Sequence, residues 1–91
     1  MYRVETTSKF KRDFERIKKR KKDLKRFYEV VALLSASDKS LPAKYKDHKL
    51  SGDLAGYREC HIENDWLLIY KKEKDKLILL LTQTGNHSDL F

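Results

Sequence analysis

The sequence predicts an α+β fold in which two N-terminal helices pack against a small antiparallel sheet, as a single domain spanning residues 1–91. Apolar residues recur with helical spacing between residues 8 and 34, and the spacing changes to that of strands after residue 57. A stretch without periodicity, which contains the only proline, separates the two halves. The expected order of elements is therefore strand, helix, helix and then three strands.

The first strand and the first helix follow from local signals. Residues 2–6 alternate in polarity and include β-branched side chains, as short strands do. Thr7 or Ser8 can cap the following helix, because a hydroxyl accepts a hydrogen bond from an unpaired first-turn amide. Phe10, Phe14 and Ile17 then share one helical face. We expect this helix to end in the basic run near residues 20–23.

The second helix should begin after Asp23, whose carboxylate can cap it. Helices joined by so short a connection are expected to lie antiparallel. The helical spacing predicts that its buried face consists of Leu24, Phe27, Tyr28, Val31 and Leu34.

The C-terminal half reads as a loop followed by strands. Residues 35–45 form the loop, and strands are expected at 57–63, 66–71 and 76–83, with turns at 64–65 and 73–75. Such short turns produce an antiparallel meander. Residues 77–81 are apolar on both faces of their strand, which is typical of a central strand. We expect helices to cover one side of it and further structure, partly from a second polypeptide, to cover the other.

The positive charge is concentrated in one segment. Between Lys9 and Arg26 the chain has eleven lysines and arginines against three acidic residues, whereas the rest is close to neutral. A one-sided basic surface attracts phosphate and is a frequent mark of nucleic-acid binding. An ordinary solvated helix face is the alternative. The absence of any acid favours phosphate binding at the run Lys18, Lys19, Arg20, Lys21 and Lys22.

Composition excludes several protein classes. Cys60 is the only cysteine, so an internal disulfide is impossible and a reducing compartment is expected. No stretch approaches the roughly 18 apolar residues of a membrane span, and the N-terminus lacks the apolar run of a signal peptide. We therefore expect a cytoplasmic protein with no membrane association. Its small core makes a stabilising partner plausible.

The polar residues of the second half fit the chemistry of RNA cleavage. RNA supplies its own nucleophile, the 2′-hydroxyl, so a cleaving protein needs a base, an acid and positive charge near the phosphate. Histidine can serve as either acid or base near neutral pH. The candidate acids and bases are His48, His61, Asp65 and His87. The candidate cations are Lys46, Lys49 and Arg58, and the candidate rings for stacking on bases are Tyr57, Trp66 and Phe91.

Metal sites are a competing use of the same residue types. Structural zinc usually takes closely spaced ligand pairs. Cys60 and His61 are adjacent, so in a strand they point to opposite faces and cannot easily share an ion. Glu63 and Asp65 flank a turn without a further carboxylate for magnesium. We therefore expect no metal ion and no other cofactor.

Three segments resemble the YafQ branch of the RelE/ParE toxin superfamily. They are Tyr45–Gly52, Gly56–Tyr70 and Thr84–Phe91, in which reactive side chains recur at matching spacing. The resemblance implies a microbial-RNase-like fold and a toxin of a bacterial type II toxin-antitoxin pair. Such toxins enter the ribosomal A site and cleave messenger RNA without a metal. It also implies a protein antitoxin as partner, which in complex with the toxin represses their shared operon.

The resemblance also assigns roles to residues. His48, His61, Asp65 and His87 match the catalytic set, with His87 as the acid and His48 or Asp65 as the base. Trp66 follows the catalytic aspartate, and Phe91 matches an aromatic that helps hold RNA. Relatives commonly carry arginine at the position of Gln83, so here Arg58 or Lys46 is expected to supply the missing charge. The basic run is expected to dock on ribosomal RNA, on a surface separate from the histidines.

Two other functions remain open at the level of sequence. A ParE-like member would poison DNA gyrase and lack the residues that cleave RNA. A non-catalytic RNA-binding module would use the histidines only to contact phosphate. The histidine set argues against the first of these.

Overall fold

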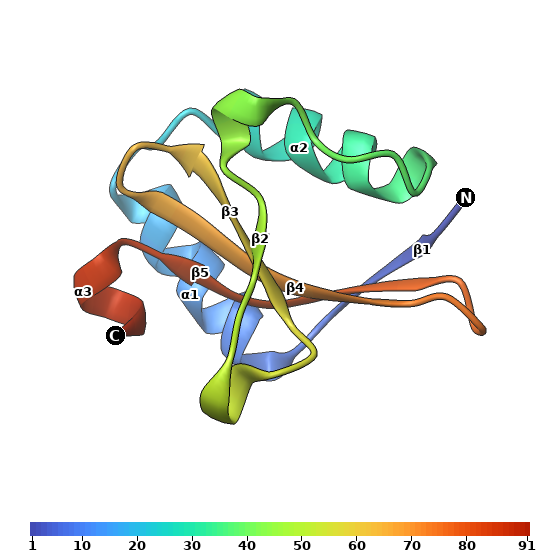
Figure 1. The fold of residues 1–91 in the computed structure, drawn as a ribbon. Helices are drawn as coiled ribbons and strands as arrows, with labels where there is room; N and C mark the ends of the chain where they lie inside the picture. Colours follow the sequence, from blue (N-terminus) through green and yellow to red (C-terminus); the bar gives the residue numbers. More distant parts are fainter.

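A computed structural model describes residues 1–91 and shows an α+β fold built on one five-stranded sheet, with strand order β1-β5-β4-β3-β2 (Figure 1). The strands are β1 (Arg3–Thr6), β2 (His48–Lys49), β3 (Arg58–Glu63), β4 (Trp66–Glu73) and β5 (Ile78–Gly85). The helices are α1 (Ser8–Lys19), α2 (Leu24–Ala36) and α3 (His87–Leu90), with short 3-10 turns at Ala43–Tyr45 and Gly52–Leu54. None of the helices combines the length and apolar character needed to cross a membrane.

The expected helix starts are confirmed. The Thr7 hydroxyl accepts a hydrogen bond from the Phe10 amide at 2.9 Å, and the Asp23 carboxylate accepts one from the Lys25 amide at 3.1 Å. Each cap satisfies a donor that the helix itself cannot pair. The break between α1 and α2 therefore falls in the basic run, as the sequence predicts.

The sheet is mixed, which corrects the expected antiparallel sheet. The meander β3-β4-β5 is antiparallel, but β1 pairs with β5 in parallel. A parallel pair needs a long crossover, and here α1, α2 and the strands β2–β4 lie between the two partners in the chain. The local pattern of β1 does not reveal which strand it pairs with. The strand β2 and the helix α3 were also not predicted, because two and four residues are too short to show a period.

The core lies between the helices and one face of the sheet. Phe10 and Ile17 of α1 and Phe27, Val30 and Leu34 of α2 are buried in it. The expected face of α2 was wrong at Tyr28, which is 58% exposed, whereas Val30 is fully buried. Positions 27, 30 and 34 follow the i, i+3, i+7 spacing of one stripe, and residue 28 lies about 100° around the helix from residue 27.

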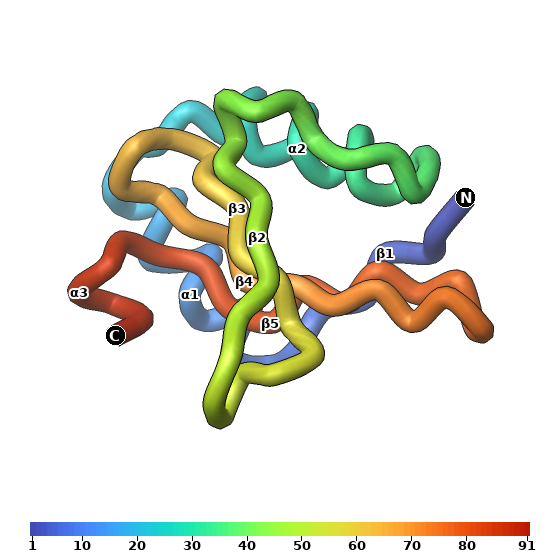
Figure 2. The backbone as a smooth tube through the Cα atoms, viewed as in Figure 1, coloured from blue at the N-terminus to red at the C-terminus, as the bar shows by residue number.

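Strand alternation divides β3 and β4 between two faces. Cys60 on β3 pairs with Leu68 on β4, and both belong to the core on the helix side. Glu59 and His61 therefore point to the other face, where they pair with Ile69 and Leu67. We call this other face the histidine face. Figure 2 shows β2 and β3 crossing the β4–β5 hairpin steeply, so the sheet is strongly twisted.

A bulge in β5 sets which of its residues reach the histidine face. Ile69 pairs with Gln83, whereas the next residue, Tyr70, pairs with Leu81, so Thr82 is the extra residue. An extra residue reverses the alternation beyond it. The bulge therefore places Gln83 and Gly85 at positions on the histidine face, where they pair with Ile69 and Leu67.

Candidate active site

Two histidines from distant parts of the chain meet at one end of the histidine face. The ring centroids of His61, on β3, and His87, at the start of α3, lie 6.0 Å apart. The Nδ1 atom of His61 lies 3.3 Å from the carbonyl oxygen of Asn64. Since a carbonyl oxygen only accepts hydrogen bonds, Nδ1 carries the proton of the neutral ring and Nε2 keeps its lone pair.

Asp65 holds His87 by two contacts. Its Oδ1 atom lies 2.7 Å from Nδ1 of the His87 ring and accepts a hydrogen bond from the His87 backbone N–H at 3.1 Å. These hydrogen bonds, the backbone one foremost, lower the pKa of the Asp65 carboxyl, and the charge of Lys22 adds to the effect. Asp65 is thus ionised at neutral pH and holds the Nδ1 side of the His87 ring, whose Nε2 has no protein partner.

The short helix α3 is fixed from its other side by Asp89. The Asp89 carboxylate accepts a hydrogen bond from the Asn86 amide, which completes a capping box, and binds both terminal nitrogens of Arg20 at 2.6 and 3.1 Å. The Arg20 guanidinium is the main reason that the pKa of Asp89 falls to about 2. A Cβ at Gly85 would meet Asp89 at 2.8 Å, so only glycine allows this approach.

The third histidine lies on the same face beside a buried acid. β2 pairs with β3 so that His48 is opposite Glu59. The Nδ1 atom of His48 lies 2.8 Å from the backbone oxygen of Lys46, and Nε2 lies 3.3 Å from Glu59 Oε1. Glu59 is only 5% exposed, and its Oε2 atom has no hydrogen-bond partner. Sequence reasoning missed Glu59, although alternation along β3 places it on the same face as His61.

A cavity of about 470 Å³ adjoins His61 and Asp65. Its cations come from three parts of the chain that the fold brings together, and they are Lys22, Arg26, Lys44 and Lys46. Only Lys46 among these was expected at the site. The rest of the lining is Tyr45, Ile62, Glu63 and Asn64. Its four cations outnumber its two acids, so this concave space beside His61 can accept a phosphodiester.

Comparison with known proteins identifies the family. The family model YafQ, a bacterial toxin of type II toxin-antitoxin systems, matches residues 2–91. The chain belongs to the YafQ family. This confirms the resemblance to the YafQ branch drawn from the sequence.

Named relatives cover nearly the whole chain. The mRNA interferase toxin YafQ of Escherichia coli strain K12 is 42% identical over 88 residues, which is 97% of this chain and 94% of the relative. A metal-bound toxin from Helicobacter pylori has a TM-score of 0.92 and 43% identity, with 100% of both chains covered. A chain of the E. coli DinJ–YafQ complex has a TM-score of 0.90 and 37% identity, covering 100% of this chain and 99% of that chain.

In this member of the YafQ family, Trp66 does not lie where its ring could stack on RNA, which corrects the role expected for it. Its ring is fully buried, lies parallel to Phe27 with centroids 6.3 Å apart, and donates an Nε1–H hydrogen bond to Thr84 at 2.9 Å. Strand alternation on β4 turns this residue toward the helices, opposite to Leu67. Trp66 is therefore a core residue beneath the site.

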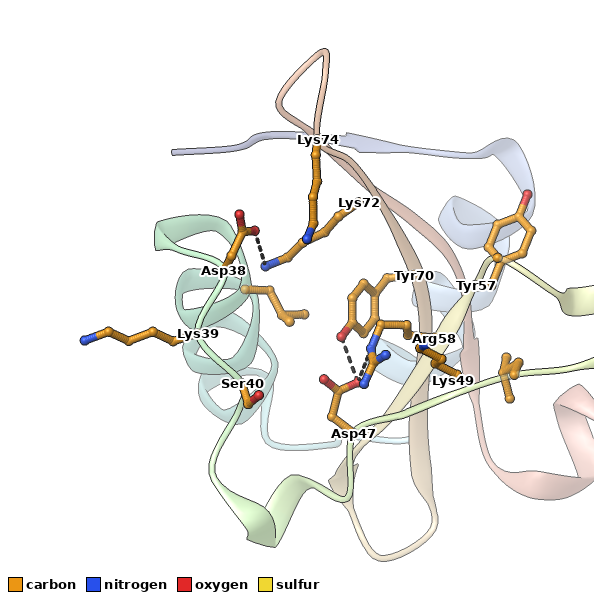
Figure 3. Close-up of a pocket in the computed structure, with 13 residues that line it drawn as sticks. Asp38, Lys39, Ser40, Asp47, Lys49, Tyr57, Arg58, Tyr70, Lys72 and Lys74 are labelled. Carbon is orange, nitrogen blue, oxygen red and sulfur yellow. Dashed lines mark hydrogen bonds and ion pairs between the residues drawn. The ribbon is translucent and has the colours of Figure 1, made fainter.

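Arg58 also points away from the histidines, so it cannot supply the charge that Gln83 lacks. Its Nε lies 3.3 Å from Asp47 Oδ1, which also accepts a hydrogen bond from the Tyr70 hydroxyl at 2.7 Å (Figure 3). This cluster lines a second cavity of about 560 Å³ near the C-terminal end of α2. Tyr57 and Lys49 line the same cavity rather than the histidine site.

The basic run is continuous with the histidine site rather than separate from it. Figure 1 shows the α1–α2 connection, the β3–β4 turn and α3 at the same end of the molecule. Arg20 is paired with Asp89, and Lys22 lines the cavity beside Asp65. Lys18, Lys19 and Lys21 are exposed around them. Arg20 therefore anchors α3 rather than offering a free cation to a ribosome.

Proposed function

We propose that this YafQ protein, as one toxin domain over residues 1–91, is an endoribonuclease that cleaves messenger RNA on the ribosome in the cytoplasm. The observation that carries the proposal is the pair His61 and His87, whose rings lie 6.0 Å apart, with His61 lining a cationic cavity. Each ring has its Nδ1 side held and its Nε2 free, as proton transfer requires. The E. coli relative that bears the name mRNA interferase toxin supports the same activity.

The proposed reaction divides the proton transfers between the two rings. Neutral His61 removes the proton of the 2′-hydroxyl through Nε2, and the freed oxygen attacks the adjacent phosphorus. His87, protonated and stabilised by Asp65, donates its Nε2 proton to the departing 5′-oxygen. The products are a 2′,3′-cyclic phosphate and a 5′-hydroxyl. Asp65 is already bound to His87, so it orients the acid and does not serve as the base.

Positive charge beside the rings would bind the phosphate backbone. Lys22, Arg26, Lys44 and Lys46 line the cavity next to His61. Phe91 is 67% exposed at the end of the chain, where its ring is available to stack on a base. We propose that these side chains hold the message while His61 and His87 act on it.

The proposed reaction needs no metal, although a Helicobacter pylori relative is a metal-bound toxin. No three histidine, cysteine or acidic side chains of this chain are grouped so as to hold an ion. We expect cleavage to proceed at an unchanged rate after the toxin is treated with EDTA. A matched control with Mg²⁺ shows that the ribosomes are intact. Loss of cleavage that only added Zn²⁺ or Cu²⁺ restores would contradict the metal-free reaction.

The decisive experiment removes the acid. His87→Ala should reduce ribosome-dependent cleavage by about 10²- to 10⁴-fold while leaving ribosome binding unchanged. Primer extension on the messenger RNA measures the cleavage. Asp65→Asn should give a smaller loss, because the ring remains but its charge is no longer stabilised. Equal loss of binding and cleavage in His87→Ala would favour a non-catalytic RNA-binding module. Full cleavage by His87→Ala would refute the assignment.

We further propose that a protein antitoxin binds this toxin and that the complex represses their operon through DNA contacts of the antitoxin. The E. coli toxin of similar structure is known in complex with DinJ. The chain is basic, with a net charge of +7, so an acidic partner segment would be attracted to it. Coexpression with a neighbouring reading frame, followed by co-purification and relief of growth arrest, tests this partner.

A further inference from the structure

We propose that Glu59 is a positioning residue that keeps His48 in its doubly protonated form, so that His48 acts as a fixed positive charge and not as the base. The effect on cleavage rests on the proposed function, whereas the protonation of His48 can be tested without it. The inference assigns a task to a buried acid that the reaction described above does not use.

The first argument is the surroundings of the His48 ring. Both ring nitrogens face oxygen atoms, since Nδ1 lies 2.8 Å from the Lys46 carbonyl oxygen and Nε2 lies 3.3 Å from a Glu59 carboxylate oxygen. A neutral imidazole has one N–H, so one nitrogen would point a lone pair at an oxygen. The imidazolium has two N–H groups and satisfies both contacts.

The second argument is the burial of Glu59. Its side chain is 7% exposed, and His48 is its one cationic partner within 4.0 Å. The neighbouring cation on β3, Arg58, is turned to the other face and bound to Asp47. An ionised carboxylate in such a position is costly unless it is paired. Removing the proton from His48 would leave this buried charge unpaired, so the pair retains it.

A single proton shared by the pair has two possible positions, on the imidazole or on the carboxyl. The imidazole is the more basic group by about 2 pH units in ordinary solution, which places the proton on His48. The other charged or titratable groups nearby are Lys46, Asp47 and Lys49, on the segment of His48 itself, and His61, two residues along β3 from Glu59. Neither lysine provides a negative charge that could replace Glu59, and the carboxylate of Asp47 is bound to Arg58 and Tyr70 instead.

The position of His48 gives this charge a use. His48 and His61 extend from neighbouring strands on the histidine face, with Glu59 opposite His48 and two residues from His61. Gln83, on the same face beyond Ile69, has no charge. A fixed cation next to the acid and base would stabilise the extra negative charge that phosphorus acquires in the transition state. His48 therefore transfers no proton in this scheme.

The protonation of His48 is measured by NMR of the full chain labelled with ¹⁵N-histidine at pH 7. In the wild-type protein we expect both His48 ring nitrogens to show the chemical shifts of N–H groups. Glu59→Gln removes the carboxylate charge with little change of shape and should convert His48 to a ring with one N–H. Glu29→Gln, an exposed change on α2, is the matched control and should leave the His48 signals unaltered.

Cleavage gives an independent readout of the same variant. Glu59→Gln should lower the rate of cleavage at pH 8 by about 10- to 100-fold. The ratio of the wild-type rate to the variant rate should fall toward one at pH 6, because at that pH His48 takes up a proton from solvent in both proteins. A neutral His48 in the wild-type spectrum, or an unchanged ring in Glu59→Gln, overturns the proposal. If the spectra agree with it but no wild-type cleavage is seen, the proposed nuclease function fails and the Glu59–His48 pairing holds.

Discussion

The three histidines show how identical side chains acquire different capacities from the atoms that face Nδ1 and Nε2. His61 faces a carbonyl oxygen and keeps a basic nitrogen free. His87 faces the Asp65 carboxylate at Nδ1 and has no protein partner at Nε2. His48 has an oxygen at both nitrogens. A protein that needs an acid, a base and a cation can therefore obtain all three from one residue type.

Trp66 yields a prediction about stability rather than RNA binding. Trp66→Phe removes the N–H that bonds to Thr84 and leaves a small void against Phe27, in a site with no solvent exposure. We expect the free energy of unfolding to fall by roughly 1–3 kcal/mol. Urea unfolding followed by circular dichroism measures this loss.

The matched comparison for Trp66 is Phe91→Ala. Phe91 is 67% exposed, so its removal should leave the urea midpoint unchanged and weaken cleavage of messenger RNA. Cleavage by Trp66→Phe, corrected for the folded fraction, should equal that of the wild type. The opposite pattern, with an unchanged midpoint and lost cleavage in Trp66→Phe, would restore the RNA-binding role expected from the sequence.

Sequence reasoning identified the reactive residue types but not their orientation. His48, His61, Asp65 and His87 all lie on or beside one face, and alternation along β3 explains why Glu59 shares it. The misplaced residues, Trp66 and Arg58, were assigned by their chemistry alone. Strand parity would have turned both toward the helices, but parity needs the boundaries of β3 and β4, which sequence locates only within a few residues.

At the scale of elements, α3 is a helix that cannot persist alone. Four residues form one turn, which is too little for an isolated helix. Asp65 binds its first residue, and Arg20 of the α1–α2 connection binds Asp89 near its end. The element that carries His87 is therefore held by two other parts of the fold. Its shortness also explains why no periodic pattern revealed it.

The Arg20–Asp89 contact predicts a specific acid response. The folded carboxyl has a pKa of about 2, below its ordinary value of 3.8, so its stabilising contribution is complete above about pH 4 and lost as the pH falls through about 2. The Arg20 side chain is 35% exposed, so solvent screening keeps this gain small. The stability difference between the wild type and Asp89→Asn should shrink below about pH 4 and be mostly lost near pH 2.

Thermal unfolding of both proteins between pH 2 and pH 6 measures this difference. Asp75→Asn, in the exposed β4–β5 turn, is the control and should match the wild type throughout. Because Asp89 secures His87, Asp89→Asn should also reduce cleavage at pH 7. A stability difference as large at pH 2 as at pH 6 would show that the carboxylate charge is not the source of the effect.

At the scale of the whole molecule, the fold gathers positive charge at the end that bears the reactive histidines. The basic run supplies Lys22 to the cavity and Arg20 to α3, while α2 and the 3-10 turn at Ala43–Tyr45 supply Arg26 and Lys44. The sequence predicted the excess charge and its affinity for phosphate. It could not predict that this charge adjoins the histidines, because that depends on contacts between residues about 70 positions apart, such as Arg20 and Asp89.

This arrangement leads to a prediction about ribosome binding. Lys18→Glu with Lys19→Glu reverses two exposed charges beside the site without altering the cavity lining. We expect ribosome binding at about 0.1 M salt to weaken by roughly tenfold. The slope of log affinity against log salt concentration should also become shallower, by the amount that corresponds to about one phosphate contact or more. Lys74→Glu with Lys76→Glu is the matched control, because it changes the net charge equally at the far tip of the β4–β5 hairpin (Figure 1). If the long-range field of the whole protein drives binding, both double variants should weaken binding alike. If the basic end contacts ribosomal RNA directly, only Lys18→Glu with Lys19→Glu should weaken it. Ribosome sedimentation across a salt series distinguishes these two outcomes.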